Sequence, residues 1–282
     1  MSPALLRLFL MLCLGLCWSC GSPAPPPPSS STPPDASGAP RRAVGDIVDL
    51  THPFDSRTIY WPTEPLFDHH LYTEGETESG AWYASGRFSA AEHGGTHIDA
   101  PYHFWRAGST VDLVSPDRLI GPGVLIDATE ACAGDSDHII GIEELTLWEA
   151  NHGRIPTGSI VLLRTGFGDF YPDPERYMGT AERGPDAVAR LHFPGLAPEA
   201  ARWLAVERDI AAVGLDTPSI DHGRSTTYDA HVAIFEHDIP AFENVANLHL
   251  LPPTGFTVIA LPMLIRGGTG APLRIVAIME PR

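Results

Sequence analysis

Short apolar runs rich in Val and Ile recur along this 282-residue chain, and they limit the fold more than any other feature of the sequence. Runs of this length, bounded by Gly, Pro or Asp, predict buried strands rather than long helices. Six segments have this character: Ile47–Leu50, Val124–Ile126, Ile160–Leu163, Ile210–Gly214, Phe256–Leu261 and Leu273–Met279. Strands therefore outnumber helices, and we expect an α/β or α+β domain with a mixed β-sheet or barrel core.

Two segments carry helix signals instead. The segment Ile142–Ala150 follows Gly141 and has acidic residues in its first turn, where they interact favourably with the helix dipole. The segment Pro198–Arg208 begins with Pro at a first-turn position and continues with good helix formers. We find no internal repeat, so we expect these helices to flank the core of a single domain.

The N-terminal segment is typical of an exported protein. A weakly basic start precedes the apolar run Leu8–Trp18, which is too short to span a bilayer and predicts a secretory signal peptide over residues 1–20. The sequence Ser19-Cys20-Gly21 resembles the bacterial lipobox, in which Cys20 would be acylated after cleavage and anchor the protein to a membrane. Ordinary cleavage to an unanchored protein is the alternative. Either way we expect a periplasmic or lipid-anchored protein of a bacterial envelope.

Residues 21–44 consist largely of Pro, Ser, Gly and Ala, a composition that cannot bury a core and predicts a disordered linker. The folded domain is therefore expected over residues 45–282, long enough for one large core. The formal charge of −17 argues against a nucleic-acid partner and against passive adhesion to an anionic membrane. Cys132, between two alanines, is expected to be buried and inert.

One stretch, from His93 to His103, concentrates residues that could bind a metal ion. The spacing of His93 and His97 would suit one face of a helix, but the adjacent glycines 94–95 and the following Pro101 oppose a helix. In an extended chain, alternate residues share one face. The residues on that face would be His93, Gly95, His97, Asp99, Pro101 and His103.

Two imidazoles and a carboxylate leave coordination positions open on a metal ion, as a catalytic site requires and a structural site does not. The alternative is a polar surface loop with no metal. Three histidines and an aspartate at alternating positions make that alternative the weaker one. The sequence therefore predicts a metal site at this stretch.

Residues 93–104, His-Gly-Gly-Thr-His-Ile-Asp-Ala-Pro-Tyr-His-Phe, resemble the signature of the cyclase-like metal-dependent hydrolases, a family that includes bacterial kynurenine formamidase and isatin hydrolase. Three further features extend the resemblance from about Gly45 to the C-terminus. Trp61-Pro62 is similar to an early turn of the family, the block Gly214–Asp221 to a second motif, and His231 with Glu243 to a distal metal pair. After Trp61-Pro62, however, formamidases typically continue Gly-Asp, whereas this chain has Thr63-Glu64.

The resemblance implies the swivelling β/β/α fold and a homodimer or higher homo-oligomer. It also implies roles for individual residues. The first metal would be bound by His93, His97 and Asp99, and a second by His231 and Glu243, with Asp99 as a bridge. His103 would transfer protons, and Trp61 would line the substrate pocket. The metal could be zinc or manganese, with one or two ions per site, since ligands of mixed N and O type suit either.

We therefore expect an amidohydrolase that cleaves a C–N bond in a small amide, formamide or lactam, using water activated by a divalent ion and His103 as acid and base. The alternative is a non-catalytic, exported metal-binding or ligand-binding protein on the same fold. The presence of His103 favours the enzyme, because a protein that only holds a metal gains nothing from an acid–base histidine.

Several other residues admit two interpretations. Asp216 and Asp221 either orient metal-binding histidines or shape a turn. Trp82, Tyr83, Phe104 and Trp105 either belong to the core or form an aromatic wall. We expect His69-His70 to lie in a loop, His237 to be solvated, and Glu92 to support the structure or a ligand. The Gly-rich segment Arg266–Gly270 is not a phosphate loop, because it lacks the Gly-Lys-Ser/Thr ending.

Overall fold

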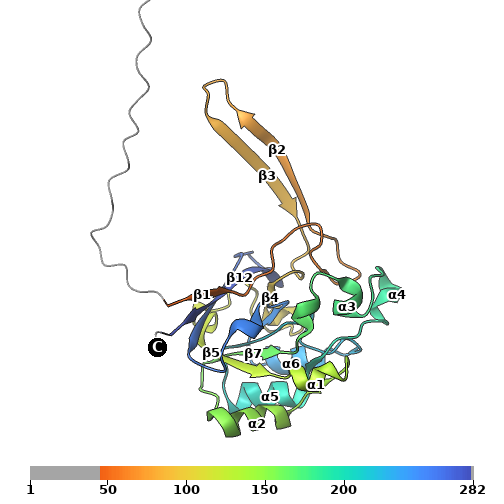
Figure 1. Cartoon of the computed structure of the whole chain (residues 1–282), viewed down its shortest axis with the longest axis vertical. Helices are drawn as coiled ribbons and strands as arrows, with labels where there is room; N and C mark the ends of the chain where they lie inside the picture. Colours follow the sequence, from red (N-terminus) through yellow and green to blue (C-terminus); the bar gives the residue numbers. More distant parts are fainter. Residues whose placement is uncertain (1–44, 281–282) are drawn as a thin grey trace, which may run out of the picture. The chain divides into compact units, whose positions relative to one another are not determined.

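The computed structural model describes residues 45–280. The expected signal peptide, the linker and Cys20 lie outside the described residues. Within these residues, the sheet with the most strands closes on itself, because β12 pairs with β11 on one side and with β4 on the other (Figure 1). The closed barrel comprises β4 (His97–Asp99), β5 (Ile120–Asp127), β7 (Ile160–Arg164), β9 (Ala212–Leu215), β10 (Ala241–Glu243), β11 (Phe256–Pro262) and β12 (Gly270–Met279).

The barrel is mixed in direction. Strands β5, β7, β9 and β10 run parallel, and antiparallel pairings of β11, β12 and β4 complete the circuit. Strand β1 (Ile47–Asp49) extends the sheet by pairing with β12. This architecture confirms the expected α/β fold with a mixed barrel core. All six predicted strand segments lie in barrel strands or in β1, although β9 begins two residues later than expected.

The alternation of apolar residues along the central strands separates two cores. Val161 and Leu163 of β7 pack in one cluster with residues of the helices, whereas Ile160 and Leu162 pack in a second cluster inside the barrel. Successive side chains of a strand point to opposite faces, so a strand buried on both faces is apolar throughout. This explains why the segments appear in the sequence as unbroken apolar runs.

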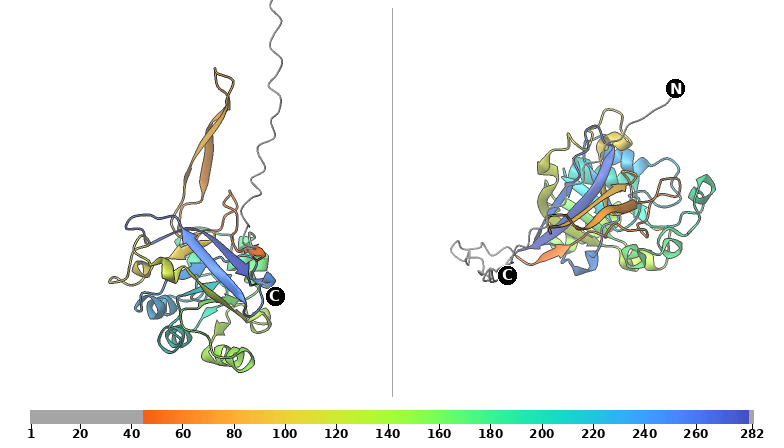
Figure 2. Two further views of the ribbon diagram at one scale, coloured as in Figure 1. Left: turned by 90° about the vertical axis from the view of Figure 1, so that its left-hand side faces the viewer. Right: turned by 90° about the horizontal axis from the view of Figure 1, so that it is seen from above.

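Helices cover the outer face of the parallel strands (Figures 1 and 2). Helix α5 (Pro198–Glu207) packs against α2 (Ile142–His152) and α6 (Asp229–Phe235). Helices α2 and α5 confirm the two helices predicted from the sequence. Shorter helical elements are α1 (Thr129–Ala133), α3 (Pro174–Met178), α4 (Pro185–Val188), and the 3-10 helices η1 (Pro101–His103), η2 (Pro116–Arg118), η3 (Phe167–Phe170) and η4 (Leu248–Leu250). In the described part of the chain, no helix is long and apolar enough to cross a membrane.

A two-stranded hairpin, which the sequence did not predict, stands away from the barrel (Figures 1 and 2). It consists of β2 (Asp68–Glu76) and β3 (Trp82–Ser89), and both strands are exposed along almost their whole length. Trp82 is 66% exposed and Tyr83 51%, so neither belongs to the core or to an aromatic wall at the site. The expectation that His69-His70 lies in a loop is wrong as well, because both residues are in β2. A second short pairing joins β6 (Ile139–Ile140) to β8 (Gly195–Leu196).

The stretch His93–His103 is extended only in part. Strand β4 covers His97–Asp99, but Gly95 has a φ of +56° and Pro101 begins the helix η1. The glycines permit this path, since a Cβ at Gly94 would lie 2.0 Å from the ring of Tyr60. A single extended face is therefore wrong for this stretch, although its histidines and Asp99 still converge.

Candidate metal centre and pocket

Strand β4 supplies the centre of the site. His97 and Asp99 lie on one face of the strand and are 2% and 1% exposed, while Ile98 points to the opposite face and packs in the core inside the barrel. Glu243 is the register partner of His97 on the neighbouring strand β10. Residues far apart in the sequence are thus brought together by the pairing of β4 with β10.

The tautomer of His97 follows from its contacts. Its Nδ1 lies 3.0 Å from the carbonyl oxygen of Gly95, which can only accept, so Nδ1 carries the proton. Its Nε2 lies 3.1 Å from Asp99 Oδ1 and 3.4 Å from Glu243 Oε2, yet it is buried and makes no hydrogen bond. Burial alone would lower the pKa of His97, but the two carboxylates outweigh it and raise that pKa to about 8.

The two carboxylates of the centre respond in opposite ways. Burial would raise the pKa of Asp99, but the surrounding His93, His231 and His97 hold it well below its ordinary range. Burial and the nearby Asp99 raise the pKa of Glu243. Two buried carboxylates this close repel each other and need a positive charge between them.

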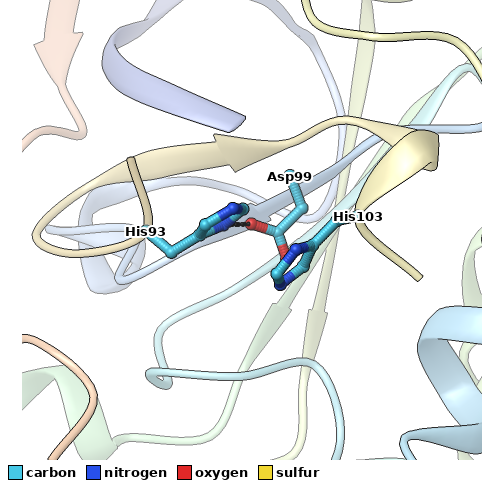
Figure 3. Close-up of side chains that lie close together, drawn as sticks. All are labelled: His93, Asp99 and His103. Atoms are coloured by element: carbon cyan, nitrogen blue, oxygen red, sulfur yellow. Dashed lines mark hydrogen bonds and ion pairs between the residues drawn. The ribbon is translucent and has the colours of Figure 1, made fainter. Parts of the chain in front are cut away.

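His93 is oriented by a chain of hydrogen bonds that begins at Glu92. The hydroxyl of Thr269 donates to Glu92 Oε2 over 2.6 Å, so its oxygen accepts from His93 Nε2 over 2.8 Å. His93 Nδ1 then faces Asp99 Oδ1 at 2.6 Å (Figure 3). The ring is therefore either an imidazolium paired with Asp99 or a neutral imidazole whose Nδ1 lone pair would face a cation. Glu92 thus supports His93, a predicted metal ligand, through Thr269.

His103 lies at the end of η1, beside the same carboxylate (Figure 3). Its ring stacks on His93 with the centroids 3.8 Å apart. Burial lowers the pKa of His103 to about 3, so the ring is neutral at ordinary pH. Ligand atoms of His93, Asp99 and His103 all lie within 4.8 Å of one another. His103 is therefore placed either to bind a metal ion or to transfer a proton.

His231, on helix α6, closes the buried end of the centre. Its Nδ1 lies 2.6 Å from Asp221 Oδ2, and its Nε2 lies 3.2 Å from Asp99 and 3.1 Å from Glu243. Burial would lower the pKa of His231, but Asp221 and the other two carboxylates raise it well above its ordinary value. Asp221 therefore orients a histidine of the centre.

The donor set suits a divalent cation. Ligand atoms of His97, Asp99 and Glu243 lie within 4.8 Å of one another, and His93, Asp99 and His103 form a second such group. The unpartnered Nε2 of His97, directed at two buried carboxylates, is the observation that a cation would explain. His231 belongs to neither group, although its Nε2 contacts two of the same carboxylates.

A pocket opens directly over this centre. Its cavity volume is about 230 Å³, which suits a small molecule. It is lined by Ile59, Tyr60, Trp61, Glu64, His93, Gly94, His97, His103, Phe104, Pro218, Ser219, Tyr228, Glu243 and Asn244. The structure thus places Trp61, expected to bind substrate, in the wall of the pocket.

The sequence did not single out Tyr228 or Thr269 as part of the site. Tyr228 has a left-handed backbone, and its ring stacks on Phe104 with the centroids 4.8 Å apart. Both rings line the pocket. Thr269 lies in the Gly-rich segment Arg266–Gly270, and its hydroxyl donates a hydrogen bond to Glu92, 177 residues away.

The other candidates lie away from the centre or shape it indirectly. Asp216 accepts hydrogen bonds from the backbone of Thr165, Gly166 and Gly168 and from the Thr165 hydroxyl, so it shapes a turn. His237 is exposed, as expected. Cys132 is buried, and burial raises the pKa of its thiol to about 12, which agrees with an inert cysteine.

Solved structures with the same fold include isatin hydrolases. Isatin hydrolase A from Labrenzia aggregata, solved with benzyl benzoate, has a TM-score of 0.75 and 33% identity, and the match covers 84% of this chain and 95% of that one. Isatin hydrolase A from Ralstonia solanacearum has a TM-score of 0.74 and 32% identity, with 83% and 92% covered.

Sequence relatives agree with this. The isatin hydrolase of Roseibium aggregatum is 30% identical over 76% of this chain and 82% of its own length. The kynurenine formamidase of Bacillus cereus is 28% identical over 81% of this chain and 95% of its own length. Residues 48–222 match the model of the Cyclase family, described as "Putative cyclase". This family match, together with hydrolase relatives that align with this chain over most of their own length, shows that the chain belongs to the Cyclase family.

Proposed function

We propose that the protein is a metal-dependent hydrolase that cleaves the C–N bond of a small amide, formamide or lactam. The observation that carries the proposal is the buried Nε2 of His97, which has no hydrogen-bond partner and faces two carboxylates at the base of the pocket. The names of the relatives, isatin hydrolase and kynurenine formamidase, support the type of bond.

The residues proposed to hold the metal are His93, His97, Asp99, His231 and Glu243. Their N and O donors suit zinc or manganese, and the two overlapping groups of ligand atoms accommodate one or two ions. When bound, a divalent ion supplies a Lewis acid that polarises a carbonyl and lowers the pKa of water to roughly 7.

His103 is proposed to move the proton. A neutral imidazole has one ring nitrogen that accepts a proton, and His103 lines the pocket beside Asp99, where it can take a proton from water. The same nitrogen can return that proton to the leaving amine as the C–N bond breaks. The stacked ring of His93 keeps the imidazole of His103 in place, and Trp61 with Phe104 limits the access of further water.

The alternative is a non-catalytic, exported protein that binds a metal or a ligand on the same fold. Two tests distinguish it from the enzyme. Metal analysis of the purified full chain should find a divalent ion, and a screen of N-formylkynurenine, isatin and simple lactams should find turnover that a chelator abolishes. Bound metal without turnover on any of them would favour the binding protein.

Export through the signal peptide, acylation of Cys20 and assembly as a homodimer or higher oligomer are proposed from the sequence alone. Labelling with a fatty-acid analogue tests the first two, because a Cys20→Ser variant should be exported without label. Light scattering on the purified protein tests the oligomeric state.

A further inference from the structure

Apart from histidines, the charged side chains that line the pocket are acidic. Among its lining residues, all of which lie in the described part of the chain, there is no lysine or arginine. Glu64 lines the pocket and is partly buried. Glu243, the other carboxylate of the lining, belongs to the metal centre, where it faces His97. Away from the metal centre, a negatively charged part of a substrate would therefore meet no lysine or arginine in the pocket wall.

Glu64 is available for pairing with a ligand. Its carboxylate makes no ion pair with any residue that the structure describes. The nearby Arg183 donates instead to the backbone carbonyl of Glu64, and Arg183 itself is exposed and does not line the pocket. This contact fixes the turn that carries Glu64 and leaves the carboxylate free.

The rings of Trp61, Phe104 and Tyr228 line the same pocket, together with the buried Tyr60. Trp61 and Tyr228 are 6.4 Å apart between centroids and inclined at 60°, and Phe104 stacks against Tyr228. The faces of aromatic rings attract cations, and cages of aromatic rings are used to bind quaternary ammonium groups. A flat neutral ring would also pack here, but it would leave Glu64 partly desolvated without a partner.

We propose that the pocket selects a substrate with a positively charged ammonium group, held by Glu64 and by the rings of Trp61, Tyr228 and Phe104. This inference rests on the proposed function, since it assigns the substrate class of the same site. The metal centre would take the amide, and the ammonium group would lie toward Glu64.

Binding of three probes that differ in charge tests the proposal without turnover. The probes are benzyltrimethylammonium, benzyl alcohol and benzenesulfonate, measured by calorimetry on the full chain as purified and after chelation. The cation should bind about tenfold more tightly than the alcohol, and the sulfonate should bind most weakly, as expected for cation–π contacts with a partly exposed carboxylate.

Two variants identify the residue responsible. Glu64→Gln should weaken binding of the cation about three- to fivefold and leave the alcohol unchanged, and added salt should weaken only the wild type. Glu74→Gln makes the same change of charge on the exposed hairpin and should have no effect. Tighter binding of the sulfonate, or an unchanged order of probes in Glu64→Gln, would overturn the proposal.

Turnover separates this inference from the proposed function. Three formanilides with aminomethyl, methyl or carboxylate groups at the para position present a positive, a neutral and a negative substituent on the same ring. Hydrolysis with a preference for the carboxylate would refute the ammonium site and leave the amidohydrolase intact. Charge-ordered binding of the benzyl probes without hydrolysis of any amide would uphold the ammonium site and count against the amidohydrolase.

Discussion

Replacement of Asp221 by Asn removes one negative charge from the buried end of the centre and keeps the size of the side chain. Asp221 Oδ2 accepts from the Nδ1 and the backbone N–H of His231, and Oδ1 accepts from the backbone N–H of Ala230. These two N–H groups belong to the first turn of α6. An Asn side chain keeps one acceptor oxygen at that turn and places an NH2 donor at the other position, so the substitution removes the charge together with the acceptor on one side.

The expected loss has two parts. Hydrogen bonds to charged groups contribute roughly 1.5–3 kcal/mol, and His231 retains Asp99 and Glu243 as partners, so the metal-free variant should lose about 2 kcal/mol of unfolding free energy. A residue that orients a metal-binding histidine typically changes metal affinity by about 10- to 100-fold, and we expect a loss of that size.

Urea unfolding of the chelated protein measures the first part, and calorimetric titration with zinc or manganese measures the second. Asp216→Asn is the matched control, because Asp216 is equally buried but its partners are Thr165, Gly166 and Gly168 rather than a histidine. The control should lose stability and keep its metal affinity. If both variants kept wild-type affinity, Asp221 would only shape the turn, and our account of His231 would be refuted.

Further predictions concern other residues. His97→Ala should lose bound metal and activity together, as elemental analysis and an assay on the same preparation would show. His103→Ala should retain metal but lose turnover about 10²–10⁴-fold, and loss of metal would instead make His103 a ligand. Burial lowers the pKa of His52 to about 4, so the folded protein binds this proton less readily than the unfolded chain, whose histidine titrates near 6.5. Stability should therefore fall from about pH 6.5 toward pH 4, by at most about 3 kcal/mol, and His52→Phe, which keeps the stacking on Tyr171, should flatten this part of the stability profile. An unchanged stability profile in His52→Phe would contradict the assignment of this pH dependence to His52.

The central strands and the two longer helices could be predicted because burial dictates their sequence pattern. Strand β7 is apolar at every position that faces either core, and α5 begins with the proline that suits a first turn. The hairpin β2–β3 could not be predicted in this way. Neither of its faces packs on a core, so its sequence has no apolar alternation to detect.

The candidate site, too, could be predicted from the sequence only in part. The local motif places His97 and Asp99 correctly on one face of a strand, since three residues of extended chain suffice for that. The support of His93 by Thr269 and Glu92 depends on a contact between residues 177 positions apart. No local pattern encodes such a contact, and the left-handed backbone of Tyr228 likewise has no signal in the sequence.

The pairing of β12 with β4 also determines when the protein can fold. This contact joins Ala271 to Ile98 and closes the barrel with the last strand of the chain. Contacts between such distant residues slow folding, because a long loop must close before they form. The strand that carries His97 and Asp99 therefore obtains its second neighbour only after β12 has been synthesised, so the candidate metal centre cannot be fully assembled before that strand pairs.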